Sequence, residues 1–176
     1  MAVKIRQAVV SDAALLSRLG ATVFRDTFEA ENTPDDMARY VAEAFTPEQQ
    51  AIEIADATGV VLLAELSNEA GEAELVGYAH VVSGEAPEAV GSAPLELRRL
   101  YVLRAWHGRG VAQALMDAVI DVARARGVKT LWLGVWERNP RAVAFYAKYG
   151  FVRVGEHTFV LGGDSQKDWV LARPIE

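Results

Sequence analysis

Residues 95–116 read LELRRLYVLRAWHGRGVAQALM, and three local patterns follow one another in them. The apolar run LELRRLYVL predicts a strand. Gly108 and Gly110 flank an arginine and predict a turn, and apolar side chains then recur at helical spacing. Unpaired backbone N–H groups and the positive end of the helix dipole meet at such a helix start. The stretch therefore predicts a site for an anionic ligand and leaves its identity open.

The residues that follow complete a strand–helix–strand unit. A helix runs from Gly110 to about Arg126 and ends at Gly127, and KTLWLGVW at 129–136 predicts the next strand. A crossover of this kind is right-handed and joins parallel strands. Residues 95–136 are therefore expected to place two parallel strands in one sheet.

After this unit the chain predicts one more helix and two strands. Asn139 is a good N-cap for a helix with Pro140 at its first position and Gly150 at its end. FVRVGEHTFVL at 151–161 and DWVLARPI at 168–175 have the composition of strands.

The N-terminal half predicts a short edge strand, three helices and a hairpin. Ser11 or Asp12 is expected to cap the first helix, and Thr33 with Pro34 to open the second. The other segments are KIRQAVV (4–10), PEQQAIEIADA (47–57), and the strands VVLLAEL (60–66) and ELVGYAHVVSG (74–84), joined by SNEAGEA (67–73). The whole order predicts a single α/β (α+β) domain over residues 1–176, with a mixed, mostly antiparallel sheet of about seven strands.

The composition limits the class of protein. With 51% hydrophobic and 24% charged residues, the 176 residues are those of an ordinary globular domain. The chain has no cysteine, which excludes disulfides and thiolate metal sites, and no metal is expected. No stretch approaches the 18 to 20 apolar residues of a membrane span, and the start does not look like a signal peptide. A cytoplasmic protein that binds no membrane is expected.

The net charge of −6 hides an asymmetry between the two halves of the chain. Residues 1–94 carry 16 acidic and 5 basic side chains, and residues 95–176 carry 8 acidic and 13 basic ones. The basic half would favour a phosphorylated ligand, and the acidic half a cation such as an amine. Both halves are equally compatible with ordinary solvated surfaces. The overall balance disfavours a nucleic-acid partner.

Two nucleotide-binding motifs do not fit the glycine turn. A Walker A loop requires GxxxxGK[ST], and no lysine follows Gly110. The dinucleotide pattern GxGxxG begins at Gly108 but meets Gln113 where its third glycine belongs, and RAWH separates the turn from its strand.

Two blocks resemble the GNAT superfamily of N-acetyltransferases. HGRGVA is similar to the family's acyl-CoA motif, Gln/Arg-x-x-Gly-x-Gly/Ala, with His107 in the Gln/Arg place. NPRAVAFYAKYGF at 139–151 resembles the helix that follows in the family, with Asn, Ala, Phe, Tyr, Gly and Phe at its spacing. The resemblance covers the whole chain and implies a sheet that splays at two central parallel strands.

Further stretches resemble the PaiA-like polyamine acetyltransferase branch. These are LYVLRAWHGRG (100–110), WLGVWERN (132–139) and GEHTFVLGGDSQKDWVL (155–171). Resemblance to this branch does not by itself determine the substrate.

The resemblance implies acetyl-CoA as cosubstrate and a set of residues that bind it. Backbone N–H groups of the glycine turn would hold the pyrophosphate, where bulky side chains would prevent contact. Asn139 is either a helix cap or a contact to the pantetheine arm. The expected cofactor-binding residues are Leu100, Tyr101, Val102, His107, Gly108, Arg109, Gly110, Val111, Ala112, Asn139, Ala142, Tyr146 and Lys148.

The resemblance also implies two proton-transfer roles. An alkylamine with a pKa near 10 is protonated at neutral pH, so forming its free base costs roughly 4 kcal/mol. Glu96 is the candidate base, eleven residues before His107, and a water chain is the alternative. Tyr146 is the candidate acid that gives a proton to the departing CoA thiolate.

The acidic segment FRDTFEAENTPDDMARY (24–40) is where the acceptor is expected to bind. Phe28, Glu31, Asp35 and Tyr40 are the candidate contacts. The negative charges of the two acidic residues favour a cationic amine such as spermidine or spermine. Another small amine, an amino acid or a peptide N-terminus stays open as acceptor. A non-catalytic acyl-CoA-binding regulatory module is the alternative of a different class. A homodimer is an expectation from the family.

Overall fold

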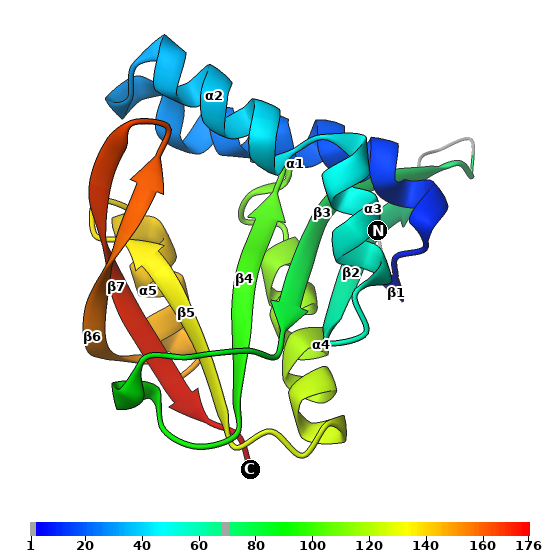
Figure 1. Cartoon of the computed structure of the whole chain (residues 1–176). Helices are drawn as coiled ribbons and strands as arrows, with labels where there is room; N and C mark the ends of the chain where they lie inside the picture. Colours follow the sequence, from blue (N-terminus) through cyan, green and yellow to red (C-terminus); the bar gives the residue numbers. More distant parts are fainter. Residues whose placement is uncertain (1–2, 68–70) are drawn as a thin grey trace.

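Seven strands form one mixed sheet in the order β1-β2-β3-β4-β5-β7-β6, in a computed structural model that describes residues 3–67 and 71–176 (Figure 1). The strands are β1 (Lys4–Gln7), β2 (Gly59–Ser67), β3 (Ala73–Val82), β4 (Pro94–Val102), β5 (Thr130–Trp136), β6 (Val152–Leu161) and β7 (Asp164–Pro174). Neighbouring strands are antiparallel except β4 and β5, which are parallel. The mixed, mostly antiparallel sheet of about seven strands is thereby confirmed. Part of the turn SNEAGEA, residues 68–70, lies outside the described residues.

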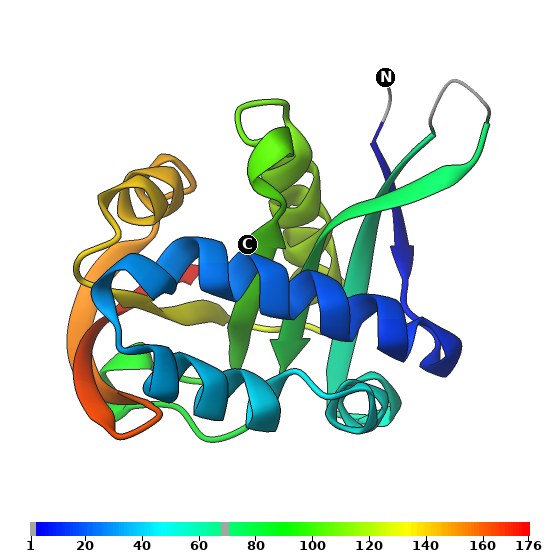
Figure 2. The same cartoon turned by 90° about the horizontal axis from the view of Figure 1, so that it is seen from above.

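The helices divide between the two faces of the sheet, as Figure 2 shows. They are α1 (Ala13–Phe28), α2 (Pro34–Ala44), α3 (Pro47–Ala55), α4 (Val111–Ala125) and α5 (Pro140–Lys148). On one face Leu115 and Met116 of α4 pack into the largest buried cluster, together with strand residues such as Leu131. On the other face Leu16 of α1 packs on Tyr78 of β3. Burial of apolar surface on both faces holds the helices to the sheet.

The two parallel strands pair only at their beginning and then separate. The register joins Pro94 to Thr130, Leu95 to Leu131 and Glu96 to Trp132, although both strands continue well beyond these residues. Figure 1 shows β4 and β5 diverging toward α1 and α2. Within residues 3–67 and 71–176, the edge of β4 that faces β5 therefore has no strand partner beyond Glu96, and its backbone groups are open to a ligand.

A β-bulge in β4 lies where the separation begins. His80 pairs with Arg99 and Val81 pairs with Leu97, so Arg98 has no partner of its own across the ladder. A bulge of this kind bends its strand and increases the local twist. The bulge at Arg98 thus turns the second half of β4 away from β5.

Two of the expected helix starts are confirmed, and one is wrong. The Thr33 and Asn139 side chains accept hydrogen bonds from the backbone N–H groups at the starts of α2 and α5, as expected. Neither Ser11 nor Asp12 caps α1, because a 3-10 turn at Val10–Asp12 runs directly into the helix. The Asp12 carboxylate instead accepts hydrogen bonds from Arg6 at 2.7 and 2.9 Å.

Candidate active site

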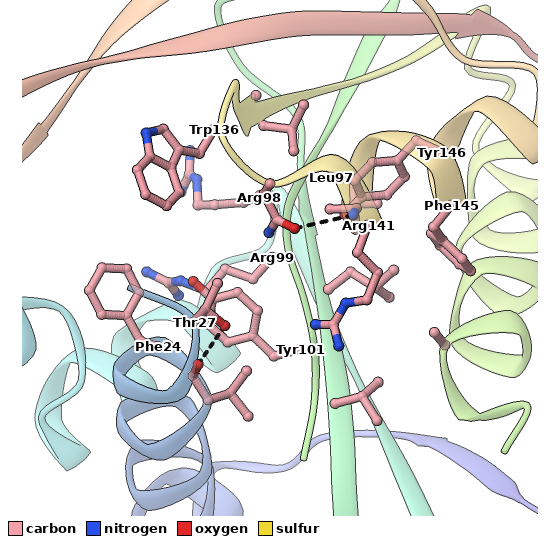
Figure 3. Close-up of a pocket in the computed structure, with 18 of the residues that line it drawn as sticks. Phe24, Thr27, Leu97, Arg98, Arg99, Tyr101, Trp136, Arg141, Phe145 and Tyr146 are labelled. Carbon is pink, nitrogen blue, oxygen red and sulfur yellow. Dashed lines mark hydrogen bonds between the residues drawn. The ribbon is translucent and has the colours of Figure 1, made fainter. Parts of the chain in front are cut away.

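The separation of β4 and β5 opens a cavity of about 740 Å³. Its walls come from α1, α2, β4, the loop before α4, β5, α5, β6 and β7. Figure 3 shows Phe145 and Tyr146 of α5 on one side of β4, and Phe24 of α1 with Trp136 of β5 on the other. We call the side formed by α5, the loop before α4, the start of α4 and the edge of β4 that faces β5 the loop wall, and the side formed by α1, α2, β5, β6 and β7 the aromatic wall.

The loop wall contains the glycine turn, and its backbone leaves room for a ligand. Gly108 has φ +73° and Gly110 has φ +83°, a left-handed conformation that favours glycine. A Cβ at either position would meet nothing within 4 Å. The N–H groups of the first turn of α4 have no intrahelical partner, and no side chain of the described residues caps them. This geometry fits the anion site that the sequence predicts.

His107 lies in the same wall, but its ring is already engaged. Its Nε2 lies 2.9 Å from the Val102 carbonyl oxygen, and Arg141 donates to its Nδ1. A carbonyl only accepts and a guanidinium only donates, so Nε2 carries the hydrogen and Nδ1 accepts. His107 is among the expected cofactor-binding residues, and in the structure both of its ring nitrogens have protein partners, one of them the guanidinium of Arg141. Arg141 also lines the cavity and was missed, because an arginine on an exposed helix start carries no distinctive pattern.

Arg109, Gly110 and Val111 do not line the cavity, whereas the other expected cofactor residues do. Arg109 is exposed, and its guanidinium lies 5.2 Å from the ring centroid of Trp106. Val111 is buried in the core, and its side chain is not part of the cavity. Asn139 caps α5, because its Oδ1 accepts a hydrogen bond from the Ala142 N–H at 3.2 Å, and only its amide nitrogen remains for a ligand. The expected residues that line the cavity are Leu100, Tyr101, Val102, His107, Gly108, Ala112, Asn139, Ala142, Tyr146 and Lys148.

Tyr146 projects from α5 into the cavity and is 9% exposed. Its ring packs edge-on against Phe145 and Phe151, at centroid distances of 5.5 and 5.6 Å. Burial raises the pKa of its hydroxyl above the usual range, so the hydroxyl keeps its proton at neutral pH. Tyr146 is thus placed as a neutral hydrogen-bond donor.

Glu96 lines the cavity at the point where β4 and β5 separate. Its carboxylate accepts a hydrogen bond from Arg98, the bulge residue, at 3.0 Å. The bulge therefore supplies a cation that fixes the orientation of this carboxylate.

The aromatic wall is a continuous set of packed rings. Phe24 stacks on Tyr40 with a centroid distance of 4.4 Å and contacts Phe28 at 4.6 Å. Phe28 continues to Trp136 at 5.4 Å, and Tyr40 to Phe159 at 5.5 Å. Of the expected acceptor contacts, Phe28 and Tyr40 line the cavity.

The two expected acidic contacts do not line this cavity, although a second cavity, which Glu31 lines, shares Trp136 and Asn139 with it. This second cavity has a volume of about 320 Å³, and Glu31 pairs with Arg138 at 3.3 Å. Asp35 is exposed in the first turn of α2 and lines neither cavity. The structure therefore does not bring Asp35 together with the other candidate residues.

The acidic group within the aromatic wall is one that sequence reasoning missed. Asp168 of β7 lines the cavity and is 8% exposed, and His157 of β6 lies beside it. Both residues belong to the stretch GEHTFVLGGDSQKDWVL, which indicated a branch of the family without a role for either side chain.

A sheet that opens between two parallel strands, beside an uncapped helix start, is an architecture suited to acyl transfer. The model that describes the acetyltransferase (GNAT) family matches residues 23–151, so the chain belongs to this family and is an N-acetyltransferase. Within residues 3–67 and 71–176, no helix is long and apolar enough to cross a membrane. The same residues hold no group of three or more side chains placed to bind a metal ion.

Individual relatives agree with this assignment. The chain is 32% identical over 174 residues to an uncharacterized N-acetyltransferase of Lactobacillus delbrueckii subsp. lactis, and this alignment covers 98% of both chains. It is 32% identical over 166 residues to an N-acetyltransferase of Mycobacterium bovis, covering 94% of this chain and 99% of the relative. Among solved structures, a PaiA N-acetyltransferase of Thermoplasma acidophilum in complex with coenzyme A has the same fold, with a TM-score of 0.77 at 17% identity over 99% of both chains. The expected fold is confirmed.

Proposed function

We propose that this N-acetyltransferase moves the acetyl group of acetyl-CoA to the primary amine of a small cationic acceptor, a polyamine such as spermidine or spermine. The observation that carries the proposal is the pairing of two unlike walls in one cavity. The loop wall fits an anion, and the aromatic wall fits an alkyl chain with a positive charge. The similarity to the PaiA-like branch and the coenzyme A complex of a protein with this fold support the two substrates.

The loop wall has the groups that a CoA molecule requires. Backbone N–H groups at the start of α4 are suited to the pyrophosphate, and each such charge-assisted bond contributes roughly 1.5–3 kcal/mol. Arg141 and Lys148 line the same side and add positive charge. The open edge of β4 at Leu100, Tyr101 and Val102 is suited to pair with the pantetheine amides as an added strand would.

Tyr146 is the proposed donor to the leaving sulfur. In the transfer, the free amine forms a bond to the acetyl carbon while the carbon–sulfur bond breaks, so a proton leaves nitrogen and one reaches sulfur. Burial keeps Tyr146 protonated until that moment. A thiol has a pKa of about 8.5, so complete transfer from a buried phenol is uphill, and the hydrogen bond stabilises the developing thiolate before the proton moves.

Glu96 is the proposed group that receives the amine proton, directly or through water. It stands where the strands separate, and Arg98 holds its carboxylate in place. A carboxylate has a low affinity for this proton, so it acts as a relay toward solvent and lowers only part of the cost of forming the free amine.

The proposal is tested by release of free thiol from acetyl-CoA with a panel of acceptors. The panel contains spermidine, spermine, a monoamine, an amino acid and a peptide with a free N-terminus. We expect the highest kcat/KM with the polyamines and identify the acetylated product by mass spectrometry. A higher kcat/KM with the amino acid or peptide contradicts the proposed acceptor and leaves the acetyltransferase class intact. The cytoplasmic location and the homodimer stay predictions.

A further inference from the structure

Three neighbouring strands place a set of polar residues on one face of the sheet, beside the aromatic wall. Asp168 of β7 lies directly opposite Trp136 of β5 and opposite His157 of β6. Residues opposite each other in a ladder share a face, and Gly134 shares that face because it precedes Trp136 by two positions. All four residues line the cavity. The acceptor side of the cavity therefore has a floor made by β5, β7 and β6.

Gly134 makes the space for the two titratable side chains. A Cβ at this position would lie 2.9 Å from Nε2 of His157 and 3.3 Å from Oδ2 of Asp168. Both distances are shorter than ordinary contacts of a Cβ, so any other residue here would push these side chains aside. The glycine in the middle of β5 is thus explained by the Asp168 and His157 side chains, because its backbone is not in a left-handed conformation.

The Asp168 carboxyl group lacks the partners that a buried carboxylate normally has. Its Oδ1 is closed to water and has no hydrogen-bond partner within the described part of the chain. Its Oδ2 lies 3.8 Å from Nε2 of His157, which is too long for a hydrogen bond. Burial raises the pKa of the Asp168 carboxyl to about 6, so it is still mainly anionic at neutral pH. An anion held in this way gains from any ligand that brings hydrogen-bond donors and positive charge.

Glu96 and Arg99, two other charged residues of the lining, already have partners. Glu96, the other acidic residue of the lining, pairs with Arg98 at 3.0 Å. Arg99 pairs with Glu53, and its guanidinium lies 5.2 Å from the Phe45 ring centroid. Among the described residues that line the cavity, Asp168 is thus the acidic side chain with no arginine or lysine partner.

We propose that Asp168 is the specificity-determining anchor of the acceptor site, where its carboxylate binds a protonated nitrogen of the acceptor between Trp136, Tyr40 and His157. This inference rests on the proposed function and adds to it the group that selects a cation. The packed rings of the aromatic wall contact the alkyl part of the acceptor and attract its charge. His157 is a polar neighbour of the carboxylate, and its Nε2 lies too far from Oδ2 to donate a hydrogen bond.

The test compares wild type with Asp168→Asn, using a cationic and an uncharged acceptor. With spermidine we expect KM to rise 10- to 100-fold, with kcat and the KM for acetyl-CoA within about threefold of wild type. With an arylamine, which is neutral at the assay pH, kcat/KM should change less than threefold. Glu156→Gln is the matched control, because it removes a charge from the opposite face of β6, where Glu156 pairs with Lys167. We expect it to behave as wild type with both acceptors.

Several outcomes separate the anchor from the proposed function. An unchanged KM for spermidine in Asp168→Asn overturns the anchor, and so does an equal loss with both acceptors. A wild type that acetylates only uncharged or anionic acceptors overturns both the anchor and the polyamine proposal. Should Asp168→Asn fail to fold, Gly134→Ala is the second variant. Its Cβ displaces the side chain of His157 and the carboxyl group of Asp168 while both residues are kept. We expect it to raise the KM for spermidine tenfold or more at unchanged KM for acetyl-CoA, and an unchanged KM for spermidine overturns the anchor.

Discussion

The two walls of the cavity use different physical means to bind a ligand. The loop wall uses backbone: two left-handed glycines, the uncapped start of α4 and the open edge of β4. The aromatic wall uses side chains that come from α1, α2, β5, β6 and β7, regions far apart in the sequence. A backbone site fits a group that every substrate shares, whereas a side-chain site changes with single substitutions. The loop wall is therefore suited to the common cosubstrate, and the aromatic wall to the acceptor.

The largest expected effect separates chemistry from binding at the loop wall. Tyr146→Phe removes the hydroxyl that faces the cavity, and we expect kcat to fall by about 100- to 1000-fold, since general acids contribute roughly 10²–10⁴-fold. The KM for acetyl-CoA should stay within threefold, because the ring and its packing are retained.

Tyr149→Phe is the matched control for this variant. Tyr149 lies at the end of the same helix, and its hydroxyl donates to Asp117 at 3.2 Å, away from the cavity. It should keep at least half of the wild-type kcat. Full kcat in Tyr146→Phe, with an acceptor for which chemistry limits the rate, would show that the proposed acid is another group.

A smaller effect is expected at Glu96, where the two walls meet. Glu96→Gln keeps an oxygen that can accept from Arg98 but removes the charge that receives a proton. We expect kcat/KM for the amine to fall 10- to 100-fold, and the variant to regain rate at high pH, where more of the amine is already free. An unchanged pH–rate profile would favour a water chain without Glu96.

His107 tests whether the loop wall tolerates change when its hydrogen bonds are kept. In His107→Gln, the amide can donate to the Val102 carbonyl and accept from Arg141, so the KM for acetyl-CoA should stay within threefold. His107→Glu lacks the donor and adds a negative charge beside the proposed phosphate site. We expect its KM for acetyl-CoA to rise about tenfold, which corresponds to about 1.4 kcal/mol. Equal KM values for the two variants would place the phosphates away from His107.

The difference between the walls also explains how much the sequence could predict. The turn at Gly108 and Gly110, the cap at Asn139 and the parallel strands depend on residues near one another in the chain, and their patterns predicted the fold and the loop wall. The partner of Arg141 depends on how α5 packs beside the loop before α4, and the partners of Asp168 depend on how distant strands align. Asp168 meets His157 and Gly134 through the ladders of β7 with β6 and β5, and no spacing along the chain encodes that alignment. The acidic segment 24–40 attracted the acceptor prediction by its charge, while the acidic side chain that lines the aromatic wall lies on β7.

The last expected effect concerns stability rather than rate, and it tests the aromatic wall alone. Burial raises the pKa of Asp168 from 3.8 to about 6, so between pH 4 and 6 the folded state holds a proton that the unfolded state releases. The stabilisation from this proton is complete below about pH 4 and is lost as the pH rises through about 6. At pH 7.5 the buried charge therefore destabilises the fold by at most about 3 kcal/mol.

Asp168→Asn removes this titration, so its Tm should match that of wild type at pH 4 and exceed it by a few degrees at pH 7.5. The groups that face the carboxyl are His157 and the phenol of Tyr40, whose pKa is raised by burial, and measuring both proteins in a His157→Gln background removes the imidazole from the comparison. If Asp168 served only to stabilise the fold, the change in Tm would have the opposite sign, because the substitution would lower the Tm at pH 7.5. A variant that gains stability while it loses affinity for spermidine would show that Asp168 destabilises the fold and strengthens acceptor binding.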